Sequence, residues 1–280
     1  MTRWRKPTRP SRLLSLDETL AALGRDGRVG RRTTEVAVTD IIGSADRTTD
    51  FDEQFRLTNP ALQPRWQRLH DAMRAGTEPP PVQLVQLGEL YFVIDGHHRV
   101  SVARSLGRGW LSAHVLQLCT VAYAACCLRA AHLPAKAAER RFLEHVPLPE
   151  DTRRQLWLDD PASWSRLTDA VHAWGLRAAH HRQQLLDRCE LATNWWHEEV
   201  QPVIRQLRAH GTGVDLPDLQ LYVAALAYRD QRGETDWHPE TFTQLAASLQ
   251  CDHAARQPLR RGRRRRGAPD RRQPTDRPAT

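Results

Sequence analysis

The architecture of this chain follows from the stretch Tyr91-Phe92-Val93-Ile94-Asp95-Gly96-His97-His98-Arg99-Val100-Ser101-Val102-Ala103-Arg104-Ser105-Leu106-Gly107. The apolar run that begins at Leu90 and ends at Ile94 predicts a buried strand. The residues from His97 to Leu106 predict a helix, with Gly107 just beyond its C-terminus. A strand that enters a helix through a glycine turn presents the first free N–H groups of that helix at the turn.

This turn carries the candidate binding residues. Gly96 lets the backbone approach a ligand closely, and the helix dipole attracts an anion, phosphate above all. Asp95 is the acid beside the turn, where it would hold Mg²⁺, orient a histidine or accept a proton, so it is the candidate catalytic residue. The expected phosphate site consists of Gly96, His97, His98, Arg99 and Ser101.

A plain structural interpretation stays open for the same residues. The two histidines are also compatible with ordinary first-turn positions, one capping the helix and one exposed, although the strand and glycine turn before them favour the ligand role. Asp95 would then serve only to cap the helix N-terminus. Adjacent helical residues point about 100° apart, so the two histidines are not expected to chelate one metal ion.

The segments around the turn alternate between strand-like and helix-like patterns. We expect a short strand within residues 35–43, ended by Gly43, and a helix over 61–75, closed by Gly76. Three prolines at 79–81 force an extended turn. Strands follow over 82–87 and 113–118, the first joined to the run from Leu90 by the two-residue turn Gly88-Glu89.

In this arrangement the chain resembles the ParB/sulfiredoxin superfamily over residues 35–118. The signature box of that superfamily is a strand, Gly-x-x-Arg and a helix that ends at a glycine eleven residues after the first, as Gly96, Arg99 and Gly107 do here. The motif Asp-Gly-His-His-Arg is closer to the variants found in ParB-like proteins and free-serine kinases than to the Gly-Glu-Arg-Arg of true partition proteins. The resemblance implies a nucleotide-binding domain.

Departures from the family pattern limit what is carried over. The catalytic cysteine of sulfiredoxin would fall on His97, so sulfiredoxin chemistry is excluded. CTP-hydrolysing partition proteins have Glu and Arg where His97 and His98 stand, and their Arg- and Asn-rich box is absent here. No basic recognition helix follows either, because residues 120–250 hold 14 bases against 17 acids. A centromere-binding clamp is therefore not expected.

The remainder of the chain predicts helices throughout, and it resembles the C-terminal part of bacterial proteins with ParB-like N-terminal domains. The expected helices are 134–146, 151–158, 161–174 stopped by Gly175, 177–210 bent at Pro202, 219–229 and 240–249. Within this region we expect Trp195 and Trp196 in the core, and Cys126 and Cys127 buried. The pair His180-His181 is expected on a solvated face.

Charge is distributed unevenly along the chain. The net charge of +8 divides into +6 for residues 1–32, +7 for 251–280 and −5 for 33–250. The C-terminal arginine run cannot build a core and predicts a disordered arm, and residues 1–32 are predicted to be a basic flexible arm. Such arms can hold nucleic-acid phosphates. The alternative is a solvating tail in a chain whose 39 Arg against two Lys reflect codon bias.

Composition excludes several classes of protein. Five cysteines without a Cys-x-x-Cys pair suit a reducing compartment and provide no zinc module. The longest uncharged run, residues 110–128, is too polar for a membrane span, and no apolar segment follows the charged N-terminus. We therefore expect a cytoplasmic protein without a membrane partner and without a protein-held metal ion.

One further segment leaves two interpretations open. Residues 50–56 place two acids, an amide and an arginine around Phe51 and Phe55. Such a segment is equally suited to folding over a nucleotide and to forming a plain loop anchored by its two phenylalanines.

Together these patterns predict an α+β chain. Its expected parts are a basic flexible arm (1–32), a small mixed ParB/sulfiredoxin-like α/β domain (33–118), an all-α helical domain (119–250) and a disordered Arg-rich tail (251–280). The expected function is binding of a nucleoside triphosphate with Mg²⁺, or of a related phosphate, with hydrolysis or phosphate transfer as a further step. The alternatives are a DNA-associated adaptor that binds through its arms and a kinase for a small hydroxyl substrate. Neither catalysis nor oligomeric state follows from the sequence.

Overall fold

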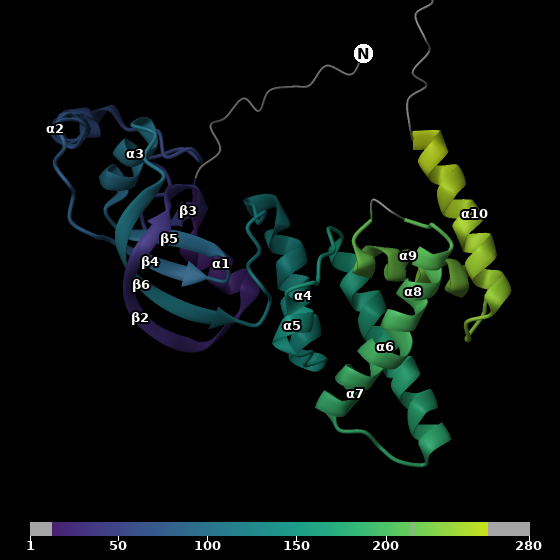
Figure 1. Cartoon of the computed structure of the whole chain (residues 1–280). Helices are drawn as coiled ribbons and strands as arrows, with labels where there is room; N and C mark the ends of the chain where they lie inside the picture. Colours follow the sequence, from purple (N-terminus) through teal and green to yellow (C-terminus); the bar gives the residue numbers. More distant parts are fainter. Residues whose placement is uncertain (1–12, 214–215, 257–280) are drawn as a thin grey trace, which may run out of the picture.

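A mixed six-stranded β-sheet occupies one end of the molecule and a bundle of helices occupies the other (Figure 1). The computed structural model describes residues 13–213 and 216–256. The α/β unit followed by helices confirms the predicted fold class. Most of the predicted tail, residues 257–280, lies outside the described residues, and residues 251–256 belong to the last helix.

The sheet has the strand order β1-β3-β5-β4-β6-β2. β4 and β5 form an antiparallel hairpin through Gly88-Glu89, as the turn predicts. β5 runs parallel to β3 and β4 runs parallel to β6, so the hairpin lies at the centre of the sheet. The strands span Leu14–Ser15 (β1), Arg25–Ala37 (β2), Ile41–Ser44 (β3), Val82–Leu87 (β4), Leu90–Asp95 (β5) and Trp110–Thr120 (β6).

Helices cover both faces of the sheet and create two hydrophobic cores. α2 (Gln63–Arg74) and α3 (His97–Ser105) lie over one face, and α1 (Leu16–Leu23) and α4 (Leu133–His145) lie over the other. Because strand side chains alternate between faces, β4 sends Val82 and Leu84 into the first core and Val85 and Leu87 into the second.

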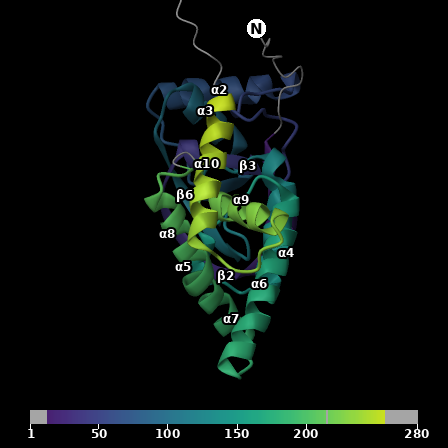
Figure 2. The ribbon, with the colours of Figure 1, turned by 90° about the vertical axis from the view of Figure 1, so that its right-hand side faces the viewer.

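The second core continues without interruption into the helical region. Phe142 of α4 packs against Trp164 and Trp195, with ring centroids 5.4 and 6.2 Å away. Trp195 and Trp196 are buried, as predicted. The remaining helices are α5 (Glu150–Arg153), α6 (Pro161–Arg182), α7 (Arg188–Trp195), α8 (Gln201–Ala209), α9 (Asp218–Gln231) and α10 (Pro239–Arg256). Figure 2 shows α10 as the outermost of them.

The predicted N-terminal arm is wrong for residues 14–32. Ser15 caps α1, and Leu16 and Leu23 enter the second core. Four of the arginines that suggested an arm, Arg25, Arg28, Arg31 and Arg32, belong to β2, which pairs along the length of β6 at the edge of the sheet. The other basic residues of the predicted arm lie within residues 1–12, outside the described residues. The side chains of β2 before Val36 are exposed or half-buried, so its sequence lacks the apolar alternation that would have revealed it. The strand expected within 35–43 is accordingly divided between β2 and β3.

Two predicted helix boundaries are also wrong. α6 runs through Gly175, where a Cβ would come 2.7 Å from Leu191 Cδ1, so this glycine permits close helix contact and does not end the helix. The single helix expected over 177–210 is broken after Arg182, where Gln183 adopts φ 54°. A π-helical turn over Trp196–Val200 precedes α8, which has Pro202 in its first turn. Proline cannot donate to the helical ladder, which accounts for irregular geometry at this point.

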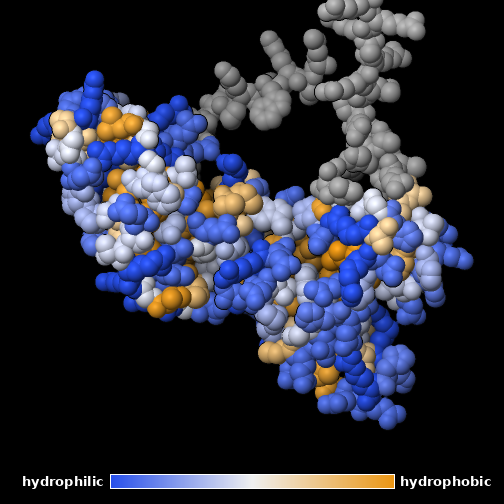
Figure 3. Space-filling view, in the orientation of Figure 1, coloured by the Kyte–Doolittle hydropathy of each residue, from blue (hydrophilic) through white to orange (hydrophobic). Residues whose placement is uncertain are grey.

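Smaller predictions had mixed outcomes. The prediction that Cys126 and Cys127 are buried is wrong, because both are exposed in the turn after β6. His180 and His181 are exposed, as predicted. α5 is shorter than expected and ends at Arg153. Among the described residues, no helix combines the length and apolar character needed to cross a bilayer. Figure 3 shows a mainly hydrophilic surface with small scattered apolar patches.

A buried ion pair lies between the sheet and the helical region. Lys136 Nζ and Glu139 Oε2 of α4 are 2.8 Å apart, and both side chains are almost fully buried. The ammonium also lies 5.0 Å from the ring centroid of Trp157. Burial raises the pKa of Glu139 to about 7 even though Lys136 opposes the shift. Because this pKa lies above the unfolded value, ionisation of Glu139 lowers the free energy of unfolding as pH rises from about 4.5 to 7.

We expect Lys136→Met to lower the free energy of unfolding by about 3–5 kcal/mol at pH 8, because it leaves a buried carboxylate without its partner. The loss should shrink at pH 5, where the carboxyl is protonated. The double variant Lys136→Met/Glu139→Leu should be at least as stable as the wild type. Urea unfolding at both pH values measures these changes, and equal losses for the single and double variants would contradict the assignment.

Candidate functional site

The junction between β5 and α3 is built around Gly96. Gly96 is the N-cap residue of α3, with φ 103°, a conformation that residues with a Cβ rarely adopt. A Cβ at this position would come 2.7 Å from Val82 Cγ1 and 2.9 Å from Arg99 Nε. The glycine has no side chain to cap the helix, so the N-terminal N–H groups of α3 receive no side-chain cap.

Arg99 folds back over this glycine. Its Nη1 donates to the carbonyl oxygens of Pro80 and Pro81 at 2.8 and 2.7 Å, and its Nη2 donates to Asp95 Oδ2 at 2.5 Å. The Arg99 side chain is 15% exposed, whereas that of Asp95 is 62% exposed. Arg99 therefore ties α3 to the proline turn, and Asp95 pairs with this guanidinium.

His97 is held by the end of β3. Its Nε2 lies 2.8 Å from Ser44 Oγ, which also accepts the N–H groups of Asp46 and Arg47. Because the Ser44 oxygen accepts both of these backbone N–H groups, the hydroxyl proton is placed to be donated to His97 Nε2. Burial lowers the pKa of His97 to about 4, against an opposing effect of Asp46, so the ring is neutral near pH 7. His97 thus joins α3 to β3.

His98 is buried without a partner for either ring nitrogen. The ring of Phe51 meets it edge-on, with centroids 5.6 Å apart. Burial lowers the pKa of His98, and the positive charges of Arg65 and Arg47 lower it further. A buried polar group without a hydrogen bond destabilises the fold by about 1–3 kcal/mol. It is the one residue of the predicted set whose polar atoms are buried without a hydrogen bond.

Ser101 is not at the helix N-terminus with the other predicted residues. Its Oγ accepts a 2.8 Å hydrogen bond from Trp66 Nε1 of α2, so it fastens α2 to α3. The structure therefore brings Asp95, Gly96, His97, His98 and Arg99 to the start of α3 and leaves Ser101 one turn further along.

The segment over residues 50–56 forms an anchored loop beside this site. Phe51 and Phe55 are each 1% exposed, and Asp52 Oδ1 accepts the backbone N–H groups of Gln54 and Arg56. Phe51 also stacks on the His97 ring, with centroids 6.0 Å apart. The loop thereby covers both histidines. Whether it folds over a ligand stays a prediction.

Two basic residues near the site escaped the sequence analysis. Arg47 follows β3, where its Nη1 lies 3.5 Å from Asp50 Oδ2, and Arg65 lies exposed in the first turn of α2. Both act electrostatically on His98. Neither belongs to a motif, and in a chain so rich in arginine no sequence signal separates them from other surface arginines.

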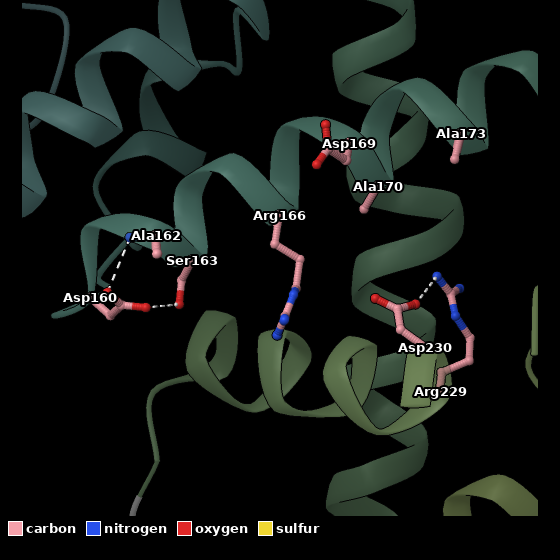
Figure 4. Close-up of a pocket in the computed structure, with 9 residues that line it drawn as sticks. All are labelled: Asp160, Ala162, Ser163, Arg166, Asp169, Ala170, Ala173, Arg229 and Asp230. Carbon is pink, nitrogen blue, oxygen red and sulfur yellow. Dashed lines mark hydrogen bonds and ion pairs between the residues drawn. The ribbon is translucent and has the colours of Figure 1, made fainter. Parts of the chain in front are cut away.

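Other hollows of the described chain are less suited to a specific ligand. One of about 430 Å³ lies between α6 and α9. Figure 4 shows Arg166 reaching from α6 toward α9, but Asp160 is used to cap α6 and Asp230 accepts from Arg229. Among the described residues, no group of three or more His, Cys, Asp and Glu side chains is arranged to hold a metal ion.

Comparison with known proteins adds one finding. No family model matches the chain, and no curated protein matches it. Among solved structures, the chain is similar to a Pnob8-like ParB-N domain, determined in a C2221 crystal form. The TM-score is 0.22 and the sequences are 12% identical, over 80% of this chain and 96% of that chain. The function proposed below therefore rests on the geometry of the site.

Arg99→Ala is expected to lower the free energy of unfolding by about 1.5–3 kcal/mol, the range for hydrogen bonds to charged groups. Asp95→Asn should cost under about 1 kcal/mol, because an exposed partner contributes little. Urea unfolding measures both variants. A fully stable Arg99→Ala variant would show that the bonds to Pro80 and Pro81 are not structural.

Stability should depend on pH through His97. Because its folded-state pKa is about 4 against 6.5 when unfolded, the free energy of unfolding should rise by up to about 3 kcal/mol between pH 4 and 6.5. His97→Asn removes this contribution while the titration of other groups is unchanged. We expect the wild-type and variant profiles from urea unfolding to diverge above pH 4.5. Parallel profiles would contradict the assignment.

Proposed function

We propose that the N-terminus of α3 binds the phosphate groups of a nucleotide or a related small molecule. The observation that carries this proposal is the combination of an uncapped helix N-terminus with His98, whose buried ring nitrogens have no partners. Helix N-termini attract anions through free N–H groups and the dipole. A phosphate oxygen that reached His98 would supply the hydrogen bond that the ring lacks.

The positive charge for binding comes from Arg47 and Arg65 in this proposal. Arg99 was the expected phosphate ligand, but three of its hydrogen bonds go to Pro80, Pro81 and Asp95. Arg47 and Arg65 approach His98 from the loop after β3 and from α2, so they flank the same ring from two elements. Arg99 then acts as a positioning residue, because it holds the helix whose N–H groups bind the phosphate.

A ligand would reach His98 only if Phe51 moves, because the ring nitrogens are buried beneath the loop that carries it. Phe51 and Phe55 hold that loop, and the ion pair of Arg47 with Asp50 lies at its N-terminal end. Binding is therefore proposed to open the loop before the ligand is enclosed, as in other sites covered by a mobile segment.

Hydrolysis or transfer of phosphate is the further step of this proposal. Mg²⁺ bound with a nucleotide needs only one or two carboxylates besides the phosphates. Asp95 is exposed at the same junction and is the nearest acid in sequence to the helix. Asp95→Asn removes its charge with little change in shape, so a phosphate-release assay on the two proteins tests this step separately from binding.

Binding should appear as a rise in melting temperature, because a ligand that binds only the folded state stabilises it. The probes are ATP, CTP, GTP, UTP and inorganic pyrophosphate, each with and without MgCl₂. At a hundredfold excess over Kd the stabilisation is about 2.7 kcal/mol, or roughly 5 °C or more. We expect at least one probe to produce this shift with the wild type, and none of them doing so would contradict the proposal.

For a probe that binds, Arg47→Gln and Arg65→Gln should each raise Kd by roughly tenfold, since a charged hydrogen bond contributes about 1.5–3 kcal/mol. Arg68→Gln is the matched control, because Arg68 is also an exposed arginine of α2. Isothermal titration calorimetry on the three variants measures the change. An equal loss for Arg68→Gln would indicate a general effect of charge and would contradict a site at α3.

A further inference from the structure

A row of arginines lies along the edge strand β2. Arg25, Arg28 and Arg31 are opposite Thr120, Leu118 and Leu116 of β6. These β6 residues are two apart, so their side chains share one face of the sheet, and so do those of the arginines. In a regular strand, residues three apart would point to opposite faces.

Two β-bulges produce this alignment. The register shifts between Arg25 and Gly27 and again between Arg28 and Gly30, so Asp26 and Val29 are the extra residues. A bulge redirects the side chains that follow it. Successive arginines are consequently about 7 Å apart along the strand, two residues of β6 each. That spacing is close to the separation of successive phosphates in an extended single strand.

All three guanidiniums are exposed, and within residues 13–213 and 216–256 none of them forms an ion pair or a hydrogen bond. Asp26, the acid between the first two, lies 3.6 Å from Arg153 of α5. The described body of the chain is mildly acidic, since residues 33–250 carry −5. The row is therefore a local concentration of free positive charge.

The same face carries exposed rings beyond the arginine row. Trp110 and His114 share the face of Leu116 on β6, and Trp110 is 62% exposed. His114 Nδ1 lies 2.9 Å from Thr33 Oγ1, which holds the imidazole in place on the sheet. Ile94 of β5, also on this face, is 41% exposed. A hollow of about 540 Å³ lies here, lined in part by Arg31, Thr33, Gln83, Ile94 and His114.

We infer that this face binds single-stranded nucleic acid. The backbone phosphates would follow Arg25, Arg28 and Arg31, and unpaired bases would stack on Trp110 and His114. Arginines that track the backbone, together with exposed aromatic rings, are the features that bind single strands without sequence preference. Base pairs would hide the base faces from Trp110, so a duplex would bind more weakly.

One residue on the face opposes this ligand. Glu35 is opposite Ser112, so its carboxylate lies on the same face between Arg31 and Trp110. Arg32, by contrast, points to the other face and donates to Gln86 and Gln117. Substitutions within β2 are therefore expected to change the affinity in opposite directions, weaker when the exposed arginines are replaced and stronger when Glu35 is replaced.

The test uses the full-length chain in which Arg263, Arg264, Arg265 and Arg266 are replaced by glutamine, to reduce binding by the C-terminal arginines. The probe is a fluorescent oligo-dT of 20 nucleotides, measured by anisotropy at about 150 mM salt. Replacing Arg25, Arg28 and Arg31 with Gln should raise Kd by tenfold or more. The slope of log Kd against the logarithm of the salt concentration should fall by about 2, which is about 0.7 for each arginine. Trp110→Ala should raise Kd by roughly five- to hundredfold, and Glu35→Gln should lower Kd.

The matched control replaces Arg68, Arg74 and Arg141 with Gln, which removes the same charge from exposed positions on α2 and α4. Kd should then change by less than threefold. Ultraviolet cross-linking followed by mass spectrometry should place the oligonucleotide on the peptide that contains Trp110 and His114. Cross-links confined to other segments, tighter binding of the matching duplex, or equal losses for the two triple variants would overturn the inference.

Discussion

The contact between Gly96 and Arg99 sets the geometry of everything at the start of α3. The glycine leaves room for the guanidinium, and the guanidinium binds the two proline carbonyls that precede β4. One side chain thus connects the helix, the end of β5 and the turn before the central hairpin. A larger residue at position 96 would meet Val82 and Arg99 while also adopting an unfavourable φ.

This contact determines which groups remain for a ligand. Arg99 and His97 are used to hold α3 in place, the first on the proline turn and the second on Ser44. What remains is the backbone at the helix N-terminus, the unpartnered ring of His98, and two arginines from neighbouring elements. In the proposed function, the motif therefore builds the site, and residues outside the motif supply much of its charge.

The two faces of the sheet are covered by different helices and carry different proposed sites. One face is covered by α2 and α3 and carries the proposed phosphate site. The other is covered by α1 and α4 over a core that includes Val85, Leu87 and Leu118, and this core extends into the helical region. On the same face, β2 exposes Arg25, Arg28 and Arg31, and β6 exposes Trp110. The proposed single-strand surface and the phosphate site are thus on separate parts of one sheet.

The sequence by itself determined the elements whose patterns are local. The apolar run from Leu90, the glycine turn and the helix from His97 are in place, as are α2, β4 and the buried tryptophans, because periodicity and turn residues specify them. Long-range contacts decided the rest. β2 is a strand only because β6 pairs with it, and its bulges align arginines that appear unrelated in sequence. The partners of Arg99 and His97 come from distant segments, and packing against Leu191 allows α6 to continue through Gly175. A pattern within one segment cannot specify such contacts, because they depend on which residues the fold brings together.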